Sequence, residues 1–395
     1  MDLFDKCRAF TRAQEAREQG WYPYFKEIQS GAGPEVTIDG RRMIMIGSNN
    51  YLGLTQHPHV IESAQKAIEK YGSGCTGSRF LNGTLDLHTE LENRLARFMQ
   101  TEAALVFSTG FQTNLGVIST IAGRDDIIFA DRSNHASIVD GCRLSFARVL
   151  KYRHNDFDHL EKLLQNHDDD AGKLIVTDGV FSMEGDIVDL PKIVELARKY
   201  NARIMVDDAH SIGVLGKHGR GTAEHYGLSP KDVDLVMGTF SKSFASLGGF
   251  IAGDAYVIDY IKHHARALIF SASMPPGSVA AVIAALDVIE SEPELLEKLW
   301  RNVNKMKKGF DEMGFNTGNS RTPIIPILIG DEMATFEFWR KLYENGIFTN
   351  PAIAPAVPPG HGLIRTSYMA THTDDILDHV LEVFYKLGKE FGLIS

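Results

Sequence analysis

A single lysine, Lys242, lies in the segment GTFSKSFASLG of residues 238–248, directly after the apolar run DLVMGT. Most lysines of a globular protein are solvated surface charges, and this interpretation stays open here. A lysine at the end of a buried strand can instead be a desolvated amine, whose lowered pKa makes it a nucleophile toward a carbonyl carbon. The hydroxyls of Thr239 and Ser241 could bind a phosphate beside it. The segment therefore predicts either an exposed cation or an amine that forms an imine.

A second candidate is the VDDAH motif of residues 206–210, which follows the apolar stretch RIMV. A strand there delivers Asp207 and His210 to its carboxyl end, where open α/β sheets bind ligands. Asp207 and Asp208 could ligate a metal, although an oxygen-ligated site usually recruits more carboxylates than cluster here. One carboxylate could instead pair with a cationic ring nitrogen, with His210 bonded to a ring substituent. A helix N-cap after a strand is the third interpretation.

Two glycine-containing segments complete the set. STGFQTN, residues 108–114, has the order strand, glycine and helix, and helix starts bind phosphates through backbone N–H groups. GSGCTGSRFLNGT, residues 72–84, contains G-x-G-x-x-G but follows a helical pattern, so a dinucleotide turn is disfavoured. It is either a plain glycine-rich loop or, as we prefer, a backbone that approaches a ligand or a partner subunit. A phosphate cradle, a ring-nitrogen carboxylate and an imine lysine are together the parts that hold pyridoxal phosphate (PLP).

The elements that position these groups alternate between helix and strand up to about residue 275. HTELENRLARFM places Leu91, Leu95 and Phe98 on one helical stripe, and EAALVFSTG predicts a buried strand. LPKIVELARKY predicts another helix, and ARIMVDD, DLVMGTFSK and GGFIAGD predict three further strands. Continuous apolar strands that alternate with helices predict an α/β fold, with a mostly parallel central sheet covered on both faces.

The pattern changes after that point. SMPPGSVAAVIAALDVIE and ELLEKLWRNVNKMKKGF predict two long helices, TPIIPILIG a strand, and DDILDHVLEVFYKLGKEF a final amphipathic helix. We therefore expect an N-terminal segment at residues 1–45, a large domain at residues 46–285 and a smaller α+β domain at residues 286–395.

Composition excludes several classes of protein. The 395 residues carry a formal net charge of −10 with no long basic run, which argues against a nucleic-acid partner. No apolar stretch approaches the roughly 20 residues of a membrane span, and the charged N-terminus lacks the apolar core of a signal peptide. Three cysteines suit a reducing, cytoplasmic compartment and argue against a disulfide framework or a zinc site, so no metal is expected.

Eight segments occur in an order known from one family: GSNNYLGL, GSGCTGSRFLNGT, FSTGFQTN, DRSNHASIVDG, TDGVFSMEGDIVDLP, VDDAHSIGVLGKHGRG, GTFSKSFASLGGFIAG and FSASMPP. Through them the chain resembles the α-oxoamine synthases, which are PLP enzymes of aminotransferase fold type I. The resemblance spans residues 20–390 and implies a decarboxylating condensation of an amino acid with an acyl thioester. GTFSKSFASLGGF and GSGCTGSRFLNGTLDLH look most like members that join L-serine to a long-chain acyl-CoA, giving 3-ketodihydrosphingosine for sphingolipid biosynthesis.

The resemblance also implies roles for matching residues. Lys242 would hold PLP as an imine and then act as base and acid at the substrate α-carbon, while Asp207 would pair with the pyridinium nitrogen. His210 would bond the ring's phenolic oxygen, and His135 would stack on the ring and approach the substrate carboxylate. Outside this setting we would interpret His135 as a capping or core histidine. Further cofactor contacts would come from Gly110, Phe111, Ser182, Thr239, Ser241 and Ser271, and substrate contacts from Arg365, Asn50 and Ser78. Ser271 would serve the second subunit of a homodimer with shared active sites.

Two sequence details bear on the amino-acid substrate. Family members that use glycine or alanine usually have a glycine before the lysine, where this chain has Ser241. Some serine-using members carry an extra arginine in a proline-rich loop, which here is NPAIAPAVPPG, so Arg365 would act alone. The alternatives are a sister enzyme for glycine, alanine or a sulfonated amino acid, a non-catalytic paralogue, and a dinucleotide oxidoreductase. An acyl carrier protein as donor, and contact with a membrane surface, stay open.

Overall fold

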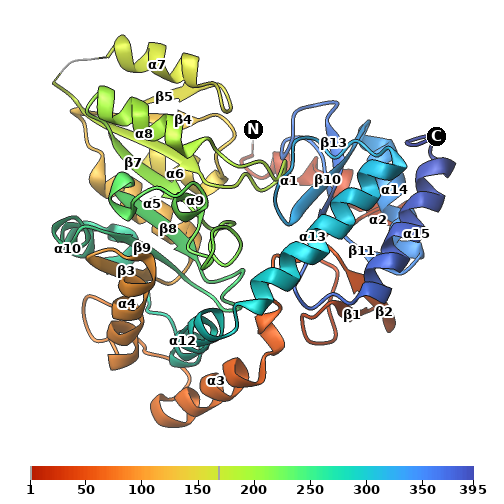
Figure 1. Cartoon of the computed structure of the whole chain (residues 1–395), viewed down its shortest axis with the longest axis horizontal. Helices are drawn as coiled ribbons and strands as arrows, with labels where there is room; N and C mark the ends of the chain where they lie inside the picture. The colour runs from red at the N-terminus through yellow and green to blue at the C-terminus, as the bar shows by residue number, and fades with distance from the viewer. Residues whose placement is uncertain (1, 168–169) are drawn as a thin grey trace.

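The computed structural model describes residues 2–167 and 170–395, which form two bodies beside each other (Figure 1). The larger body is built on a seven-stranded sheet in the order β3-β9-β8-β7-β6-β4-β5. Only β9 runs antiparallel to its neighbours. The strands are β3 (Ala103–Phe107), β4 (Asp126–Asp131), β5 (Arg148–Tyr152), β6 (Gly172–Asp178), β7 (Arg203–Asp207), β8 (Leu235–Thr239) and β9 (Gly249–Gly253). The predicted mostly parallel sheet is confirmed.

Successive residues of these strands enter two different hydrophobic cores, because side chains alternate between the faces of a sheet. In β7, for example, Ile204 and Val206 belong to one core and Met205 to the other. Helices cover both faces, which is why the strands are apolar throughout. On one side lie α5 (Gly110–Ile121), α6 (Ala136–Leu144), α10 (Ala255–His264) and α11 (Arg266–Ile269). The other core includes α4 (Asp86–Met99), α7 (Phe157–Gln165), α8 (Leu190–Lys199) and α12 (Pro276–Ser291).

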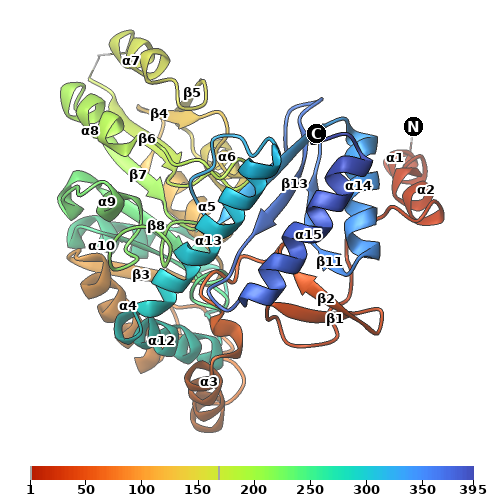
Figure 2. The same ribbon diagram turned by 45° about the vertical axis from the view of Figure 1, so that its right-hand side comes forward.

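The smaller body contains two three-stranded sheets and three long helices (Figure 2). β10 (Ile324–Gly330), β13 (Gly362–Ser367) and β12 (Asn350–Ala352) form one antiparallel sheet. The second sheet joins β1 (Glu35–Ile38) and β2 (Arg41–Met45) to β11 (Ile347–Phe348). The helices are α13 (Glu294–Met313), α14 (Glu332–Glu344) and α15 (Asp374–Glu390). Strands from the start of the chain therefore lie in space with its C-terminal part.

Local signals explain where the helices begin and end. The side chain of Asp189 caps α8 by accepting a hydrogen bond from the Lys192 amide, and Pro191 occupies the first turn. α13 ends at Gly314, whose positive φ of 90° favours glycine. The predicted helices and strands match α4, α8, α12, α13, α15 and β3, β7, β8, β9, β10. The remaining elements are α1 (Asp5–Arg8), α2 (Arg12–Glu18), η1 (Leu54–Gln56), α3 (Pro58–Tyr71), α9 (Thr222–His225) and η2 (Pro230–Asp232).

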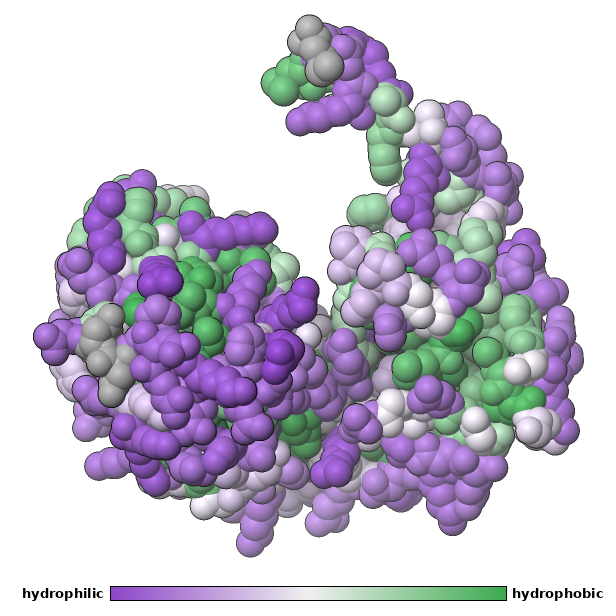
Figure 3. Space-filling model, turned by 90° about the horizontal axis from the view of Figure 1, so that it is seen from above, coloured by the Kyte–Doolittle hydropathy of each residue, from purple (hydrophilic) through white to green (hydrophobic). Residues whose placement is uncertain are grey.

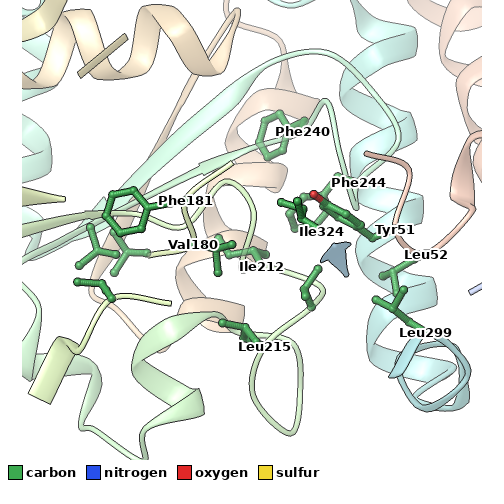
Figure 4. Packing of buried hydrophobic residues seen from close by; sticks show 14 of the residues in the cluster. Tyr51, Leu52, Val180, Phe181, Ile212, Leu215, Phe240, Phe244, Leu299 and Ile324 are labelled. Atoms are coloured by element: carbon green, nitrogen blue, oxygen red, sulfur yellow. The ribbon is translucent and has the colours of Figure 1, made fainter. Parts of the chain in front are cut away.

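One hydrophobic core continues from the large body into the small one. Figure 4 shows Leu299 of α13 and Ile324 of β10 in the same cluster as Phe240 and Phe244, which flank the Lys242 segment. This packing fixes the lysine segment against the second body. Among the described helices, none is long and apolar enough to cross a membrane.

Candidate active site

A cavity of about 260 Å³ lies at the carboxyl edge of the parallel strands. β6 ends at Asp178 and β7 at Asp207, and the two residues are direct partners in the sheet register. The sheet therefore places chemically active side chains where a ligand can reach them, as open α/β sheets generally do. The cavity lining includes Thr109, Gly110, Phe111, His135, Asp178, Asp207, His210, Thr239, Ser241 and Lys242.

Lys242 follows β8 and is partly buried, with its exposed surface in the cavity. Its Nζ atom forms no hydrogen bond with any residue of the described chain. Burial, assisted by the positive charge of Arg365, lowers the pKa of Lys242 to about 8, although Asp207 and Asp178 pull it upward. A substantial fraction of the amine is therefore unprotonated near neutral pH, which is what nucleophilic attack on a carbonyl requires.

The two adjacent carboxylates of the VDDAH motif have different surroundings. Asp207 lines the cavity, and its carboxylate accepts hydrogen bonds from Asn114 Nδ2 at 2.7 Å and the Ala209 amide at 3.0 Å. Asp208 turns away and accepts from the Thr222 amide at 3.0 Å and hydroxyl at 2.5 Å. Burial raises the pKa of Asp208 to about 6. Asp207 therefore faces the cavity, where its carboxylate can accept a further hydrogen bond from a ligand, whereas Asp208 stabilises the following loop.

His210 is buried, and its Nδ1 lies 2.7 Å from the hydroxyl of Tyr51. Burial lowers the pKa of His210, and the positive charges of Lys242 and Arg365 lower it further, so the ring is neutral. Burial also raises the pKa of Tyr51 to about 12, which keeps the hydroxyl protonated. The Tyr51 hydroxyl lies closer to His210 Nδ1, at 2.7 Å, than to Asn49 Oδ1, at 3.3 Å, so we assign its proton to the bond with His210, which places the histidine proton on Nε2. His210 lines the cavity and can donate a hydrogen bond into it.

His135 caps α6 and lines the cavity opposite the strand ends. Its backbone N–H donates to Asp178 Oδ2 at 2.7 Å, and its Nδ1 lies 2.7 Å from Ser137 Oγ. Burial lowers the pKa of His135, against the attraction of Asp207. Burial and the neighbouring Asp207 raise the pKa of Asp178. Asp178 therefore holds the loop that carries a neutral His135 over the cavity.

The start of α5 forms a cradle with free backbone donors. Thr109 is the N-cap and accepts a hydrogen bond from the Gln112 amide at 3.1 Å, so the amides of Gly110 and Phe111 are left for a ligand. A Cβ on Gly110 would lie 2.7 Å from Thr239 Oγ1, so only glycine fits there. Thr239 Oγ1 lies 3.0 Å from Ser241 Oγ. This combination suits the oxygens of a phosphate.

Arg365 of β13 reaches the site from the small body. Its Nε donates to the Ser182 carbonyl at 2.6 Å, and its Nη2 donates to Asn49 Oδ1 at 2.9 Å. Asn50, which we expected at the substrate, instead donates to the Ala32 carbonyl and to Thr55 Oγ1. The irregular chain at this point directs adjacent side chains differently, so Asn49 occupies the position expected of Asn50. Arg365 and Ser182 line a second, larger cavity that also reaches Lys242.

That second cavity has a volume of about 1060 Å³ and lies between the two bodies. Figure 3 shows the hollow between them from above, with the N-terminal arm projecting beyond the smaller body. Its lining contains Lys242 and is largely apolar, although Arg12, Glu15, Arg17 and Glu332 also belong to it. The apolar lining includes Phe10, Trp21, Met183, Met333, Phe336, Pro351, Ala352 and Ile353. The site therefore opens into a space that suits an alkyl chain.

Three predicted residues, Asn50, Ser78 and Ser271, lie outside both cavity linings. The Ser78 hydroxyl is buried without a hydrogen-bond partner in the described chain, and Ser78 forms a β-bridge with Ala272. Ser271 Oγ accepts a hydrogen bond from Gln112 Nε2 of its own chain at 3.1 Å. Gly72 follows helix α3 rather than a strand, so the glycine-rich segment is not a dinucleotide turn. It is a loop that packs on residues 272–274.

Sequence reasoning missed three residues that hold the site together: Asn49, Tyr51 and Asn114. Asn114 could have been identified from the sequence, because it lies four residues after Gly110 and therefore on the same face of α5. Tyr51 contacts a histidine 159 positions away, which no local pattern reveals.

Comparison with known proteins gives consistent results. The family model described as aminotransferase class I and II matches residues 41–384. A serine palmitoyltransferase of Sphingobacterium spiritivorum is 54% identical over 393 residues, which cover 100% of this chain and 98% of that protein. The 8-amino-7-oxononanoate synthase 1 of Bacillus subtilis is 46% identical over 378 residues, or 96% of each chain.

The solved structures agree on the fold. A serine palmitoyltransferase from S. paucimobilis with bound PLP and myriocin has a TM-score of 0.95 and 37% identity, with 100% of both chains covered. The chain therefore belongs to the aminotransferase class I and II family, within the α-oxoamine synthase group that contains the serine palmitoyltransferases.

Proposed function

We propose that the protein is a PLP-dependent serine palmitoyltransferase that condenses L-serine with a long-chain acyl-CoA. The serine α-carbon forms a bond to the acyl carbonyl carbon, and the thioester C–S bond breaks to release CoA. The bond between the α-carbon and the serine carboxylate also breaks, which releases CO2 and leaves 3-ketodihydrosphingosine. The observation that carries the proposal is an amine of lowered pKa in the same cavity as Asp207 and a phosphate cradle.

The residues of this cavity fit PLP. The amides of Gly110 and Phe111 and the hydroxyls of Thr239 and Ser241 would bind its phosphate. Asp207 would pair with the pyridinium nitrogen, and His210 would donate from Nε2 to the phenolic oxygen. Lys242 would hold the cofactor covalently, and His135 would cover the face of its ring. When bound, PLP supplies an electron sink for the electron pair released at the serine α-carbon.

The protein's own groups then position the substrate and move its proton. Arg365, oriented by Asn49 and Ser182, would bind the serine carboxylate, which suits a planar guanidinium. Lys242 Nζ would remove the α-proton and later return a proton to the same carbon. Asp207 would act electrostatically, because a buried carboxylate stabilises a neighbouring positive charge such as that of a pyridinium. The larger cavity would exclude water from the acyl chain along its wall of Trp21, Met333 and Phe336.

The protein would work as a homodimer with shared active sites. The support is a group of exposed apolar side chains beside the cofactor cavity: Leu81 is 78% exposed and Phe270 is 75% exposed. Such side chains on adjoining segments indicate a protein interface. Ser271 adjoins this patch and would serve the partner's phosphate site. Sedimentation of a Phe270→Asp variant tests the dimer: loss of the dimer supports it, and an unchanged dimer argues against this surface.

The cytoplasm is the location that we propose, because Cys7, Cys75 and Cys142 are all free.

A competition assay tests the proposed reaction. The PLP-loaded enzyme is given palmitoyl-CoA with equal concentrations of L-serine, glycine and L-alanine, and products are identified by mass spectrometry. We expect the serine-derived ketone to dominate. A dominant glycine or alanine product would assign the chain to a sister activity, as the 8-amino-7-oxononanoate synthase relatives allow. A Lys242→Ala variant should give no product.

A further inference from the structure

His154 lies between two carboxylates outside both cavity linings. Its Nδ1 is 3.1 Å from Asp131 Oδ1, and its Nε2 is 2.9 Å from Asp186 Oδ2. The side chain of Asp131 is fully buried, and those of Asp186 and His154 are only 18% and 28% exposed. Asn155 donates two further hydrogen bonds, from its backbone amide to Asp131 Oδ2 at 3.0 Å and from its side-chain Nδ2 to Asp186 Oδ2 at 2.9 Å. The cluster thus joins the end of β4 to a segment that follows β6.

Charge balance explains why a histidine is needed between the two acids. Two poorly solvated carboxylates repel each other unless a cation separates them. Desolvation alone would lower the pKa of His154, but its hydrogen bonds to both carboxylates outweigh that effect and raise it to about 10. The imidazolium also packs edge-on against Phe181, with ring centroids 4.3 Å apart. Glu184, Tyr152 and Asp178 are further titratable groups that interact with the charges of this cluster.

Asp186 closes the tight turn of residues 181–186, which carries Ser182. The Phe181 amide donates to the Asp186 carbonyl at 3.1 Å, and the Gly185 amide donates to the Phe181 carbonyl at 2.9 Å. The same turn accepts three hydrogen bonds from the small body, one of which the Arg321 amide donates to the Gly185 carbonyl at 3.3 Å. The Ser182 carbonyl accepts from Arg365 Nε at 2.6 Å, and the Gly185 carbonyl accepts from Thr322 Oγ1 at 2.9 Å.

We propose that His154, by bridging Asp131 and Asp186, is a positioning residue that sets the orientation of Arg365 toward the substrate carboxylate. The inference rests on the proposed function, because it concerns the arginine that would bind the amino acid. The bridge holds Asp186 against the end of β4, Asp186 fixes the turn, and the turn presents the Ser182 carbonyl to Arg365. A hydrogen bond weakens steeply when its angle or length changes, so a shifted turn releases the guanidinium.

The test measures whether His154 affects recognition of a carboxylate in particular. PLP-loaded wild type and a His154→Gln variant are titrated with L-serine and with ethanolamine, which lacks the carboxylate, while the cofactor absorbance is followed. We expect the variant to bind L-serine about tenfold more weakly, as for loss of one charge-assisted hydrogen bond. Binding of ethanolamine should stay within about twofold of wild type, because ethanolamine has no carboxylate for Arg365 to bind. A general structural defect would weaken both ligands equally.

Two further variants complete the design. Asp186→Asn keeps the turn's shape but weakens the bridge, and should shift L-serine binding in the same direction; it decides the question if His154→Gln does not fold. His59→Gln is the matched control, because His59 pairs with Asp287 at 3.1 Å on the exposed surface between α3 and α12. It should change neither ligand. If both bridge variants bind the two ligands equally weakly, or bind both as wild type does, the inference about His154 is wrong, but the proposed function is unaffected. If L-serine does not change the cofactor absorbance of the PLP-loaded wild type, the proposed function itself is wrong.

Discussion

Replacing Tyr51 with phenylalanine removes the hydroxyl that orients His210. Tyr51 is fully buried, and its hydroxyl lies 2.7 Å from His210 Nδ1. In the variant that nitrogen is buried without a partner, which costs about 1–3 kcal/mol. In wild type this energy favours the His210 tautomer that carries its proton on Nε2, the atom that would donate to the cofactor. The variant loses that preference. At about 1.4 kcal/mol for each factor of ten, the preference for the productive tautomer falls by roughly 5- to 150-fold.

The assay compares kcat at saturating L-serine and palmitoyl-CoA, together with the absorbance maximum of the bound cofactor. We expect kcat of Tyr51→Phe to fall by about 5- to 50-fold, because part of the lost preference is recovered by relaxation. The absorbance should shift, because the hydrogen bond from His210 to the phenolic oxygen weakens. Tyr368→Phe is the control, since Tyr368 is equally buried but packs against His372 rather than against His210 of the cavity. A Tyr51→Phe variant that matches this control in both rate and spectrum would refute the tautomer assignment.

Three further predictions follow from the same contacts. Arg365→Lys should raise the KM for L-serine by about 10- to 100-fold with a smaller effect on kcat, because an ammonium cannot hold Ser182, Asn49 and a carboxylate together; an unchanged KM contradicts the assigned role. PLP capture by the cofactor-free protein should accelerate as pH rises through about 8 rather than 10.5, since only unprotonated Lys242 reacts, and stopped-flow absorbance reads that midpoint. The pKa of His154 is raised from 6.5 to about 10 in the folded state, so its charge stabilises the fold. The unfolding free energy of wild type should therefore exceed that of His154→Gln by its full amount below pH 6.5, and the difference should disappear as the pH rises through about 10. Denaturant titration at several pH values measures this difference.

Local patterns predicted most of the fold and the central residues of the site. Strand β7 and the VDDAH motif could be predicted because an apolar run ends there in polar residues. The parallel sheet was predicted from the alternation of helices and strands. The resemblance to a family then supplied roles for Lys242, Asp207, His210 and Arg365. These residues belong to compact motifs, so their positions along the chain were enough to identify them.

Features that depend on distant contacts were beyond sequence reasoning. The choice between Asn49 and Asn50 depends on the direction of an irregular segment, which has no periodicity to indicate a face. The pairing of β2 with β11 joins residues about 300 positions apart, and patterning assigns no partner to such short strands. The bridge through His154 likewise depends on the sheet, which brings the end of β4 at Asp131 together with the loop residues His154 and Asp186.

Reduction of the PLP-loaded protein with borohydride, followed by peptide mass spectrometry, tests the central claim most directly. A buried amine of lowered pKa that faces Asp207 predicts one pyridoxyl group, located on Lys242, with loss of the visible absorbance and no label in Lys242→Ala. A pyridoxyl group on another lysine, or a wild type that gains none, would contradict the account.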